Sequence, residues 1–279
     1  MASVRDPAHD SVMGARRNPL RLHVAASIGI AALSLAGCTS GDSTTSETAS
    51  TSTAKTEPSS AVGSSTPPDC PNPEGGSCLD KLEPRTPYTT QVFTPQLTYQ
   101  VPTKNWFNYE DTPGNFLLVP PGNDLPGVNA GTSDFIGVYT AVVPARITDP
   151  NSCSFQAVPG NWSPRSMATY FQHRQNLDAS DAVPIAIGGL RGVLIDLRIK
   201  PGTKLDVCHV NGETLELGGE FTGVPPSSLD HAVIEGMTMR MIMLGSAGNV
   251  LLVEVDDIDD APVGLRALTA VARHLQFGS

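Results

Sequence analysis

The sequence has few basic residues, few aromatic residues and no apolar run long enough for a membrane-spanning helix. Lys and Arg number 18 against 28 Asp and Glu, and aromatic residues make up 5% of the 279 residues. A spanning helix needs about 20 consecutive apolar residues, which no segment reaches. Binding to nucleic acid requires clustered basic side chains that displace counterions from phosphates. The composition therefore excludes a spanning helix and gives no footprint for a nucleic-acid partner.

The motifs of common catalytic and metal sites are also absent. The chain contains no Gly-x-Ser-x-Gly, His-Glu-x-x-His or Cys-x-x-Cys sequence. We therefore predict no metal, no cofactor and no enzymatic activity. Beyond the N-terminal region the chain has four histidines, His173, His209, His231 and His274. They keep one alternative open, an extracytoplasmic hydrolase assembled from distant residues, because catalytic triads are defined by geometry rather than by order.

The N-terminal region contains a basic segment at 16–21, an apolar segment at 22–35 and then Leu35-Ala36-Gly37-Cys38. This order resembles the lipobox of bacterial lipoprotein signal peptides. The resemblance implies that residues 1–37 are a cleaved signal peptide and that Cys38 carries a diacylglycerol and a further acyl chain such as palmitate. It also implies a lipoprotein held outside the cell membrane without a spanning helix. A buried helix before an ordinary cysteine is the alternative. The export route, general secretion or twin-arginine, stays open.

The remaining chain divides into three parts by composition. Removal of residues 1–37 takes away four Arg and two Asp, which leaves 14 basic and 26 acidic residues and a net charge of −12. Residues 38–69 are rich in Ser and Thr and predict a disordered tether behind the lipidated cysteine. Residues 70–87 form a Pro-rich lead-in, and residues 88–279 are long enough for one globular domain.

Four cysteines besides Cys38 predict disulfide bonds in an exported, secreted-type protein. They are Cys70, Cys78, Cys153 and Cys208, and four cysteines allow three pairings. We favour Cys70–Cys78, which closes a short loop, together with Cys153–Cys208. A zinc site is disfavoured because the spacing of the cysteines is wrong and no histidine pair lies nearby.

The pattern of the folded part predicts an α+β fold, with an antiparallel sheet of about seven strands and two main helices packed on it. Strand patterns occur at residues 97–101, 116–119, 135–143, 192–199, 237–244 and 250–255, and the last two flank a turn at 245–249. Ser163 and Pro164 predict one helix start, and Asp260-Ala261-Pro262 predicts the other, with apolar residues from Leu265 to Leu275 on one face.

Four sequence features along residues 90–277 carry a family resemblance. They are Leu97-Thr98-Tyr99-Gln100-Val101-Pro102 followed by Asn105-Trp106, the segment Val183 to Gly192 with its Gly-Gly-Leu-x-Gly sequence, a late hairpin, and a final helix ending in Leu275-Gln276-Phe277. This order resembles actinobacterial Lpq-type lipoproteins, whose domain is similar to the PsbP fold. The resemblance implies an envelope-associated, non-enzymatic binding or accessory protein, with no catalytic residues to carry over.

Met237, Met239, Met241 and Met243 alternate along one predicted strand, which places all four side chains on one face. Core packing is favoured, because methionine fills irregular gaps well. The alternatives are an apolar groove for a lipid or peptide and, least favoured, a copper site.

Charged and aromatic residues elsewhere are assigned structural roles. The run Asp256-Asp257-Ile258-Asp259-Asp260 is expected to cap the last helix and be solvated, rather than to bind calcium. Asp196 and Arg198 are expected to form a surface ion pair. Trp106 and Trp162 are expected at the edge of the core.

These features together predict a membrane-anchored cell-envelope lipoprotein. Its domain would be a binding or accessory module for an apolar ligand, such as a lipid, or for an envelope partner protein. It would meet the membrane only through its lipid anchor.

Overall fold

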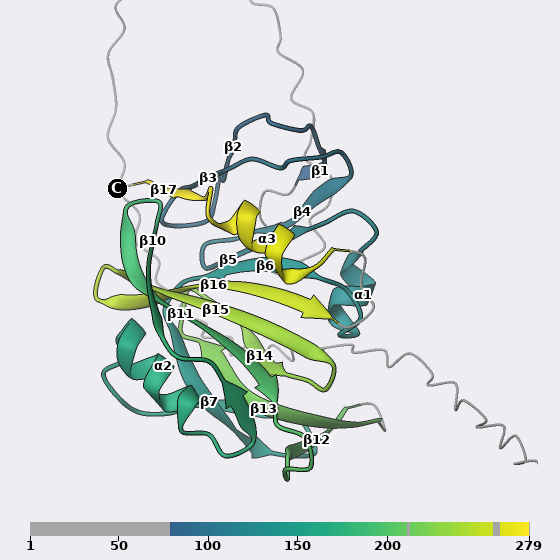
Figure 1. The fold of residues 1–279 in the computed structure, drawn as a ribbon, viewed down its shortest axis with the longest axis vertical. Coiled ribbons are helices and arrows are strands. Elements are labelled where there is room, and N and C mark those ends of the chain that lie inside the picture. The colour runs from purple at the N-terminus through teal and green to yellow at the C-terminus, as the bar shows by residue number, and fades with distance from the viewer. Residues whose placement is uncertain (1–78, 211–212, 259–262, 279) are drawn as a thin grey trace, which may run out of the picture. The chain divides into compact units, whose positions relative to one another are not determined.

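The computed structural model describes residues 79–210, 213–258 and 263–278 (Figure 1). It is mostly β, with 50% strands and 12% helix. Three antiparallel sheets and three helices make up this part of the chain. The predicted signal peptide, Cys38, the tether, Cys70 and Cys78 lie outside the described residues.

A central sheet of nine strands organises the fold. Its order is β1 (Leu79–Leu82), β4 (Trp106–Asp111), β5 (Asn115–Val119), β6 (Phe135–Tyr139), β16 (Asn249–Ile258), β15 (Met237–Ser246), β11 (Leu190–Ile199) and β10 (Val183–Ile187), with β9 (Leu177–Ala179) also paired to β11. Because β1 pairs with β4, the fold extends in front of residue 88, where we expected the domain to begin.

Two smaller sheets flank the central one. The five-stranded sheet has the order β12 (Asp206–Val210), β13 (Glu213–Gly223), β7 (Val142–Asp149) and β8 (Ser154–Ala157), with β14 (Asp230–Val233) paired to β13. The three-stranded sheet has the order β17 (Gln276–Phe277), β3 (Leu97–Tyr99) and β2 (Tyr88–Thr89). The helices are α1 (Leu125–Asn129), α2 (Pro164–Gln172) and α3 (Leu265–Ala272).

The helix α2 begins where the sequence predicts. Ser163 is the N-cap, its hydroxyl accepts a hydrogen bond from the Ser166 N–H, and the Ser166 side chain accepts one from the Ser163 N–H. Pro164 occupies the first position, where a missing N–H costs nothing. Met167 and Phe171 are buried against β11 and β15.

The helix α3 covers the opposite face of the central sheet, over β6 and β16 (Figure 1). Its predicted apolar face is correct, since Leu268, Val271 and Leu275 are buried. Its N-cap is Gly264, which makes no side-chain capping hydrogen bond. The expected start at residues 260–262 lies outside the described residues.

The β15–β16 hairpin is the longest pairing in the sheet and confirms the strongest hairpin prediction. Ser246 pairs with Asn249 across the two-residue turn of Ala247 and Gly248. Both turn residues have positive φ, 47° and 83°, as a turn that follows the twist of the strands requires.

Two apolar cores lie on opposite faces of the central sheet. The first holds side chains from α3, from the three-stranded sheet and from Leu251, Val253 and Val255 of β16. The second holds side chains from α2, from the five-stranded sheet and from Val250 and Leu252, which alternate with them. One strand therefore supplies both cores.

The expectation of an α+β fold with two main helices on a sheet of about seven strands is wrong. The helices α2 and α3 exist, but they cover opposite faces, and three sheets are present among the described residues. Several missed strands are short and carry little apolar alternation, such as β2, β8 and β9. Such strands form because neighbouring strands supply their hydrogen bonds, a long-range effect that local patterns do not report.

Candidate functional site

Two acidic residues lie buried on the core-facing side of β16. The side chains of Glu254 and Asp256 are 0% and 1% exposed, and they continue the row that begins with Val250 and Leu252. A buried charge is costly unless it is paired or loses its charge by binding a proton. Such a pair in an otherwise apolar strand marks a site that packing alone does not explain.

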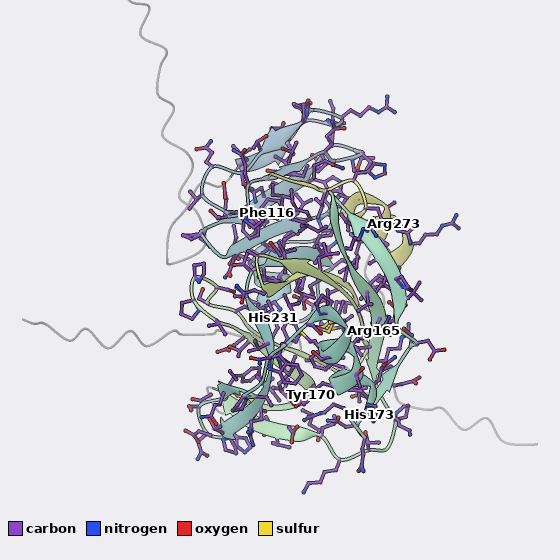
Figure 2. The ribbon with its side chains drawn as sticks, turned by 90° about the vertical axis from the view of Figure 1, so that its left-hand side faces the viewer. Phe116, Arg165, Tyr170, His173, His231 and Arg273 are labelled. Atoms are coloured by element: carbon purple, nitrogen blue, oxygen red, sulfur yellow. A yellow bond between two sulfur atoms is a disulfide. The ribbon has the colours of Figure 1, made fainter. Side chains whose placement is uncertain are left out.

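His231 of β14 reaches this pair from the five-stranded sheet. Its Nδ1–H donates a hydrogen bond to Oε2 of Glu254 over 2.9 Å. Its ring packs edge-to-face with the rings of Phe135, Tyr139 and Phe221, at centroid distances of 5.9, 5.5 and 5.9 Å. Figure 2 shows His231 in the middle of the molecule, between Phe116 and Tyr170. The side chain is 31% exposed, so the site is connected to the surface through the histidine.

Asp256 has a raised pKa, which favours its protonated form. Burial, the charge of Glu254 and a hydrogen bond with Glu254 together raise the pKa of Asp256 well above its usual range. Two buried acceptor atoms, Oε1 of Glu254 and Oδ1 of Asp256, have no donor among the described residues. A proton on Asp256 would supply a hydrogen-bond donor between the two carboxyl groups and would remove the repulsion between two buried negative charges.

His231 forms the other end of the same chain. Burial alone would lower the pKa of His231, but the charge of Glu254 and its hydrogen bond outweigh burial and raise it above the usual value. The result is a chain of three groups, Asp256, Glu254 and His231, in which the two end groups, Asp256 and His231, each have a raised pKa.

Asp134, just before β6, adds a further buried carboxyl nearby. Its two oxygens accept hydrogen bonds from the N–H groups of Ile258 and Val263, so it fastens the end of β16 to the segment before α3. Burial is the main reason that the pKa of Asp134 is raised to about 6.

This arrangement can store and pass protons. It also supplies two of the three parts of a catalytic triad, a histidine and the carboxylate that orients it. In the described part of the chain no serine or cysteine hydrogen-bonds to His231, and no group of three or more His, Cys, Asp and Glu side chains has the geometry to hold a metal ion.

The other three histidines are exposed and make local hydrogen bonds. His173 and His274 contact the carbonyls of Thr169 and Ala270 in their own helical segments. His209 contacts the hydroxyl of Thr214 on the neighbouring strand β13.

The predicted Cys153–Cys208 disulfide is confirmed, with a Cα–Cα distance of 5.1 Å. It joins the turn between β7 and β8 to β12. The sulfur of Cys208, beside His209, is therefore bonded to Cys153 and is also fully buried, so it is no free thiol nucleophile.

The four methionines of β15 fill the second core. Met239, Met241 and Met243 are fully buried and Met237 is 7% exposed, and they pack with Met167 and Phe171 of α2. The structure places no groove beside them in the described residues, because α2 and the five-stranded sheet occupy that space.

Two other expected roles are corrected. Asp256 of the acidic run is buried in β16 instead of capping α3. Asp196 pairs with Arg240, its direct neighbour on β15, rather than with Arg198, through two hydrogen bonds of 2.7 Å. Trp162 is half-buried against the second core, as expected for a core edge, whereas Trp106 is fully enclosed in the first core.

Another group of ion pairs lies just beyond the C-terminal end of α2. Arg174 contacts both Asp206 and the fully buried Glu220, at 2.8 and 2.9 Å. Burial raises the pKa of Glu220 to about 7, against the opposing charge of Arg174. Its Oε1 has no hydrogen-bond partner in the described residues.

Two shallow surface depressions lie among the described residues, and neither is lined by the histidine. The larger, about 620 Å³, lies beside α3. A smaller one of about 260 Å³ lies between the β9–β11 pair and Leu265. No helix in the described ranges is long and apolar enough to cross a membrane.

Sequence reasoning missed the His231–Glu254–Asp256 chain. The signal was present in β16, where two acids replace apolar residues at alternating positions of a strand that is otherwise apolar. His231 gave no signal, because it reaches the acids only once two sheets have packed together.

No family model, no curated protein and no solved structure matches this chain.

Proposed function

We propose that this protein is a membrane-anchored cell-envelope lipoprotein whose folded domain is a non-enzymatic binding or accessory module. The proposal depends above all on Leu35-Ala36-Gly37-Cys38, which follows a basic and then an apolar segment. Lipidation at Cys38 would hold the domain outside the membrane, as in the actinobacterial Lpq-type lipoproteins that the sequence resembles.

The Cys153–Cys208 disulfide supports an extracytoplasmic location. Disulfide bonds form and persist in exported proteins and are rare in reducing compartments. The net charge of −12 after cleavage supports attachment through the lipid rather than through the surface, because anionic lipid repels an acidic protein.

The packing of the methionines favours an envelope protein as the partner over an apolar ligand held beside β15. All four side chains are enclosed, so a lipid could reach them only by displacing α2 or the five-stranded sheet. A partner protein needs no such opening.

Replacement of Cys38 by Ala tests the anchor. We expect the variant to leave the membrane fraction and appear in soluble form, whereas Cys78→Ala, which leaves the lipobox intact, stays bound. A Cys38→Ala variant that remains fully membrane-bound would contradict the assignment. Native mass spectrometry of the protein purified from its own envelope, followed by crosslinking in cells, then separates a retained lipid from a protein partner.

The hydrolase alternative retains one supporting observation, the His231–Glu254 pair. Its test is the turnover of chromogenic esters by the purified protein. Activity that is lost in His231→Gln would favour the enzyme, and equal rates in both proteins would reject it.

A further inference from the structure

The hydrogen bond from His231 to Glu254 joins two different sheets. His231 lies on β14, which pairs with β13 at Phe221, and Glu254 lies on β16 in the central sheet. Around this bond the two sheets meet through Phe135, Tyr139 and Phe221, the three aromatic side chains that surround the histidine. The polar contact therefore lies inside an apolar seam between the sheets.

The charged groups that act on this bond from the surrounding elements are all acidic. Glu254 and Asp256 come from β16, Glu110 from β4, Asp230 from β14 itself, and Asp134 from the segment before β6. Tyr139 of β6 is the remaining titratable side chain beside the histidine. A protonated His231 opposes the charge of Glu254, Glu110 and Asp230, so the charge of the seam depends on how many protons the histidine holds.

We propose that Asp256, Glu254 and His231 form a proton-controlled latch, which keeps β14 and the five-stranded sheet closed on the central sheet and loosens when its protons leave. This inference concerns the described residues alone and does not rest on the proposed lipoprotein function.

The direction of the switch follows from the two protonated groups. In the closed state the pKa of Asp256 and of His231 both lie above their usual values of about 3.9 and 6.5. The closed state therefore holds more protons than an open, hydrated one, and rising pH favours opening. Loss of the Asp256 proton would leave two adjacent buried carboxylates. Loss of the His231 proton would remove their counter-charge.

Opening would expose the aromatic seam. Phe221 is fully buried, and Phe135 and Tyr139 are 4% and 2% exposed in the closed state. Water entering at the histidine, the exposed end of the chain, would reach these rings first. A domain with this latch would present apolar surface at alkaline pH and hide it in acid.

Hydrogen exchange of the whole protein tests the latch. We expect the protection factors of amides in β14 to fall by up to about tenfold per pH unit above the pKa of His231, for each proton released. Amides of the β15–β16 hairpin away from Glu254, near Ser246 and Asn249, should keep their protection and serve as the internal reference.

Two variants make the test specific. Asp256→Asn keeps the shape and a donor toward Glu254 but cannot lose a proton, so the part of the pH dependence that comes from Asp256 should disappear while the part from His231 remains. Asp178→Asn removes an exposed carboxylate on β9 and should behave as the wild type. If Asp256→Asn does not fold, His231→Gln, which keeps an amide donor without a titrating ring, replaces it, and the part that comes from His231 should then disappear instead.

Three results would overturn the proposal. They are pH-independent protection of β14 in the wild type, an undiminished pH dependence in Asp256→Asn, and a His231 imidazole that titrates below 6.5 by NMR. A fall in protection that is confined to β14 and β13 in the wild type, and is reduced in Asp256→Asn, would support the proposal.

Discussion

Removal of the Cys153–Cys208 bond should cost the domain a large part of its stability. The bond closes a loop of 55 residues, and the chain-entropy relation for a loop of that length gives about 4 kcal/mol at 25 °C. For a domain of this size, about 1 kcal/mol corresponds to roughly 2–4 °C in Tm, so the expected fall is roughly 8–16 °C. The bond stabilises by restricting the unfolded chain, which makes reduction the cleanest perturbation.

Urea unfolding followed by tryptophan fluorescence measures this effect, because Trp106 is buried and Trp162 half-buried in the folded domain. The wild type and the Cys153→Ala/Cys208→Ala double variant are each compared with and without reductant. Reductant changes the free energy of unfolding in each protein. The change in the double variant comes from the other cysteines, so subtracting it from the change in the wild type gives the contribution of the Cys153–Cys208 bond alone. A difference below about 1 kcal/mol, with thiol counting showing that the bond was reduced, would refute the reasoning.

Two further predictions concern packing and pH. Gly114→Ala should destabilise by about 1–3 kcal/mol or more, since its Cβ would lie 2.3–2.5 Å from the backbone of Pro226 and Ser227. The matched variant Gly245→Ala meets only ordinary contacts at 3.7–4.0 Å and should change Tm little; equal losses would contradict the packing argument. The pKa of Asp134, raised by burial to about 6, gives stability that is fully present below about pH 4 and is lost as pH rises to 6. Asp256 acts in the same direction. Calorimetry should therefore show a higher Tm at pH 5 than at pH 8, and Asp134→Asn should reduce the difference; a higher Tm at pH 8 would reverse the sign of the argument.

The parts of the fold that local physics determines were predictable. Ser163 and Pro164 define the start of α2 through capping, which involves neighbours in sequence. The β15–β16 hairpin follows from alternation and a short turn. The Cys153–Cys208 bond was the favoured one of three possible pairings, because Cys70 and Cys78 are close enough in sequence to close a short loop with each other.

The predictions that were wrong concern features that depend on which strands become neighbours in the sheets. Asp196 pairs with Arg240 because the register of β11 against β15 places the two residues opposite each other. The sequence of β11 alone suggested Arg198, which lies on the same strand. The β12–β13 hairpin was missed although Asn211-Gly212, a strong turn sequence, separates its strands. The acidic run was interpreted from its position before a helix, whereas β16 continues to Ile258 and buries its first member.

The last strand of the central sheet bears on whether copies of this protein can join through their sheet edges. β10 ends the order of described strands, and Val183 at its start is 54% exposed. An open edge of this kind invites the same strand of another molecule to extend the sheet, and the growing ribbon would be an aggregate. Pro184 contributes no N–H at that edge, and the gap between Ala179 of β9 and Val183 breaks the edge into two short pieces. Copies of this domain would thus remain individual molecules instead of joining edge to edge.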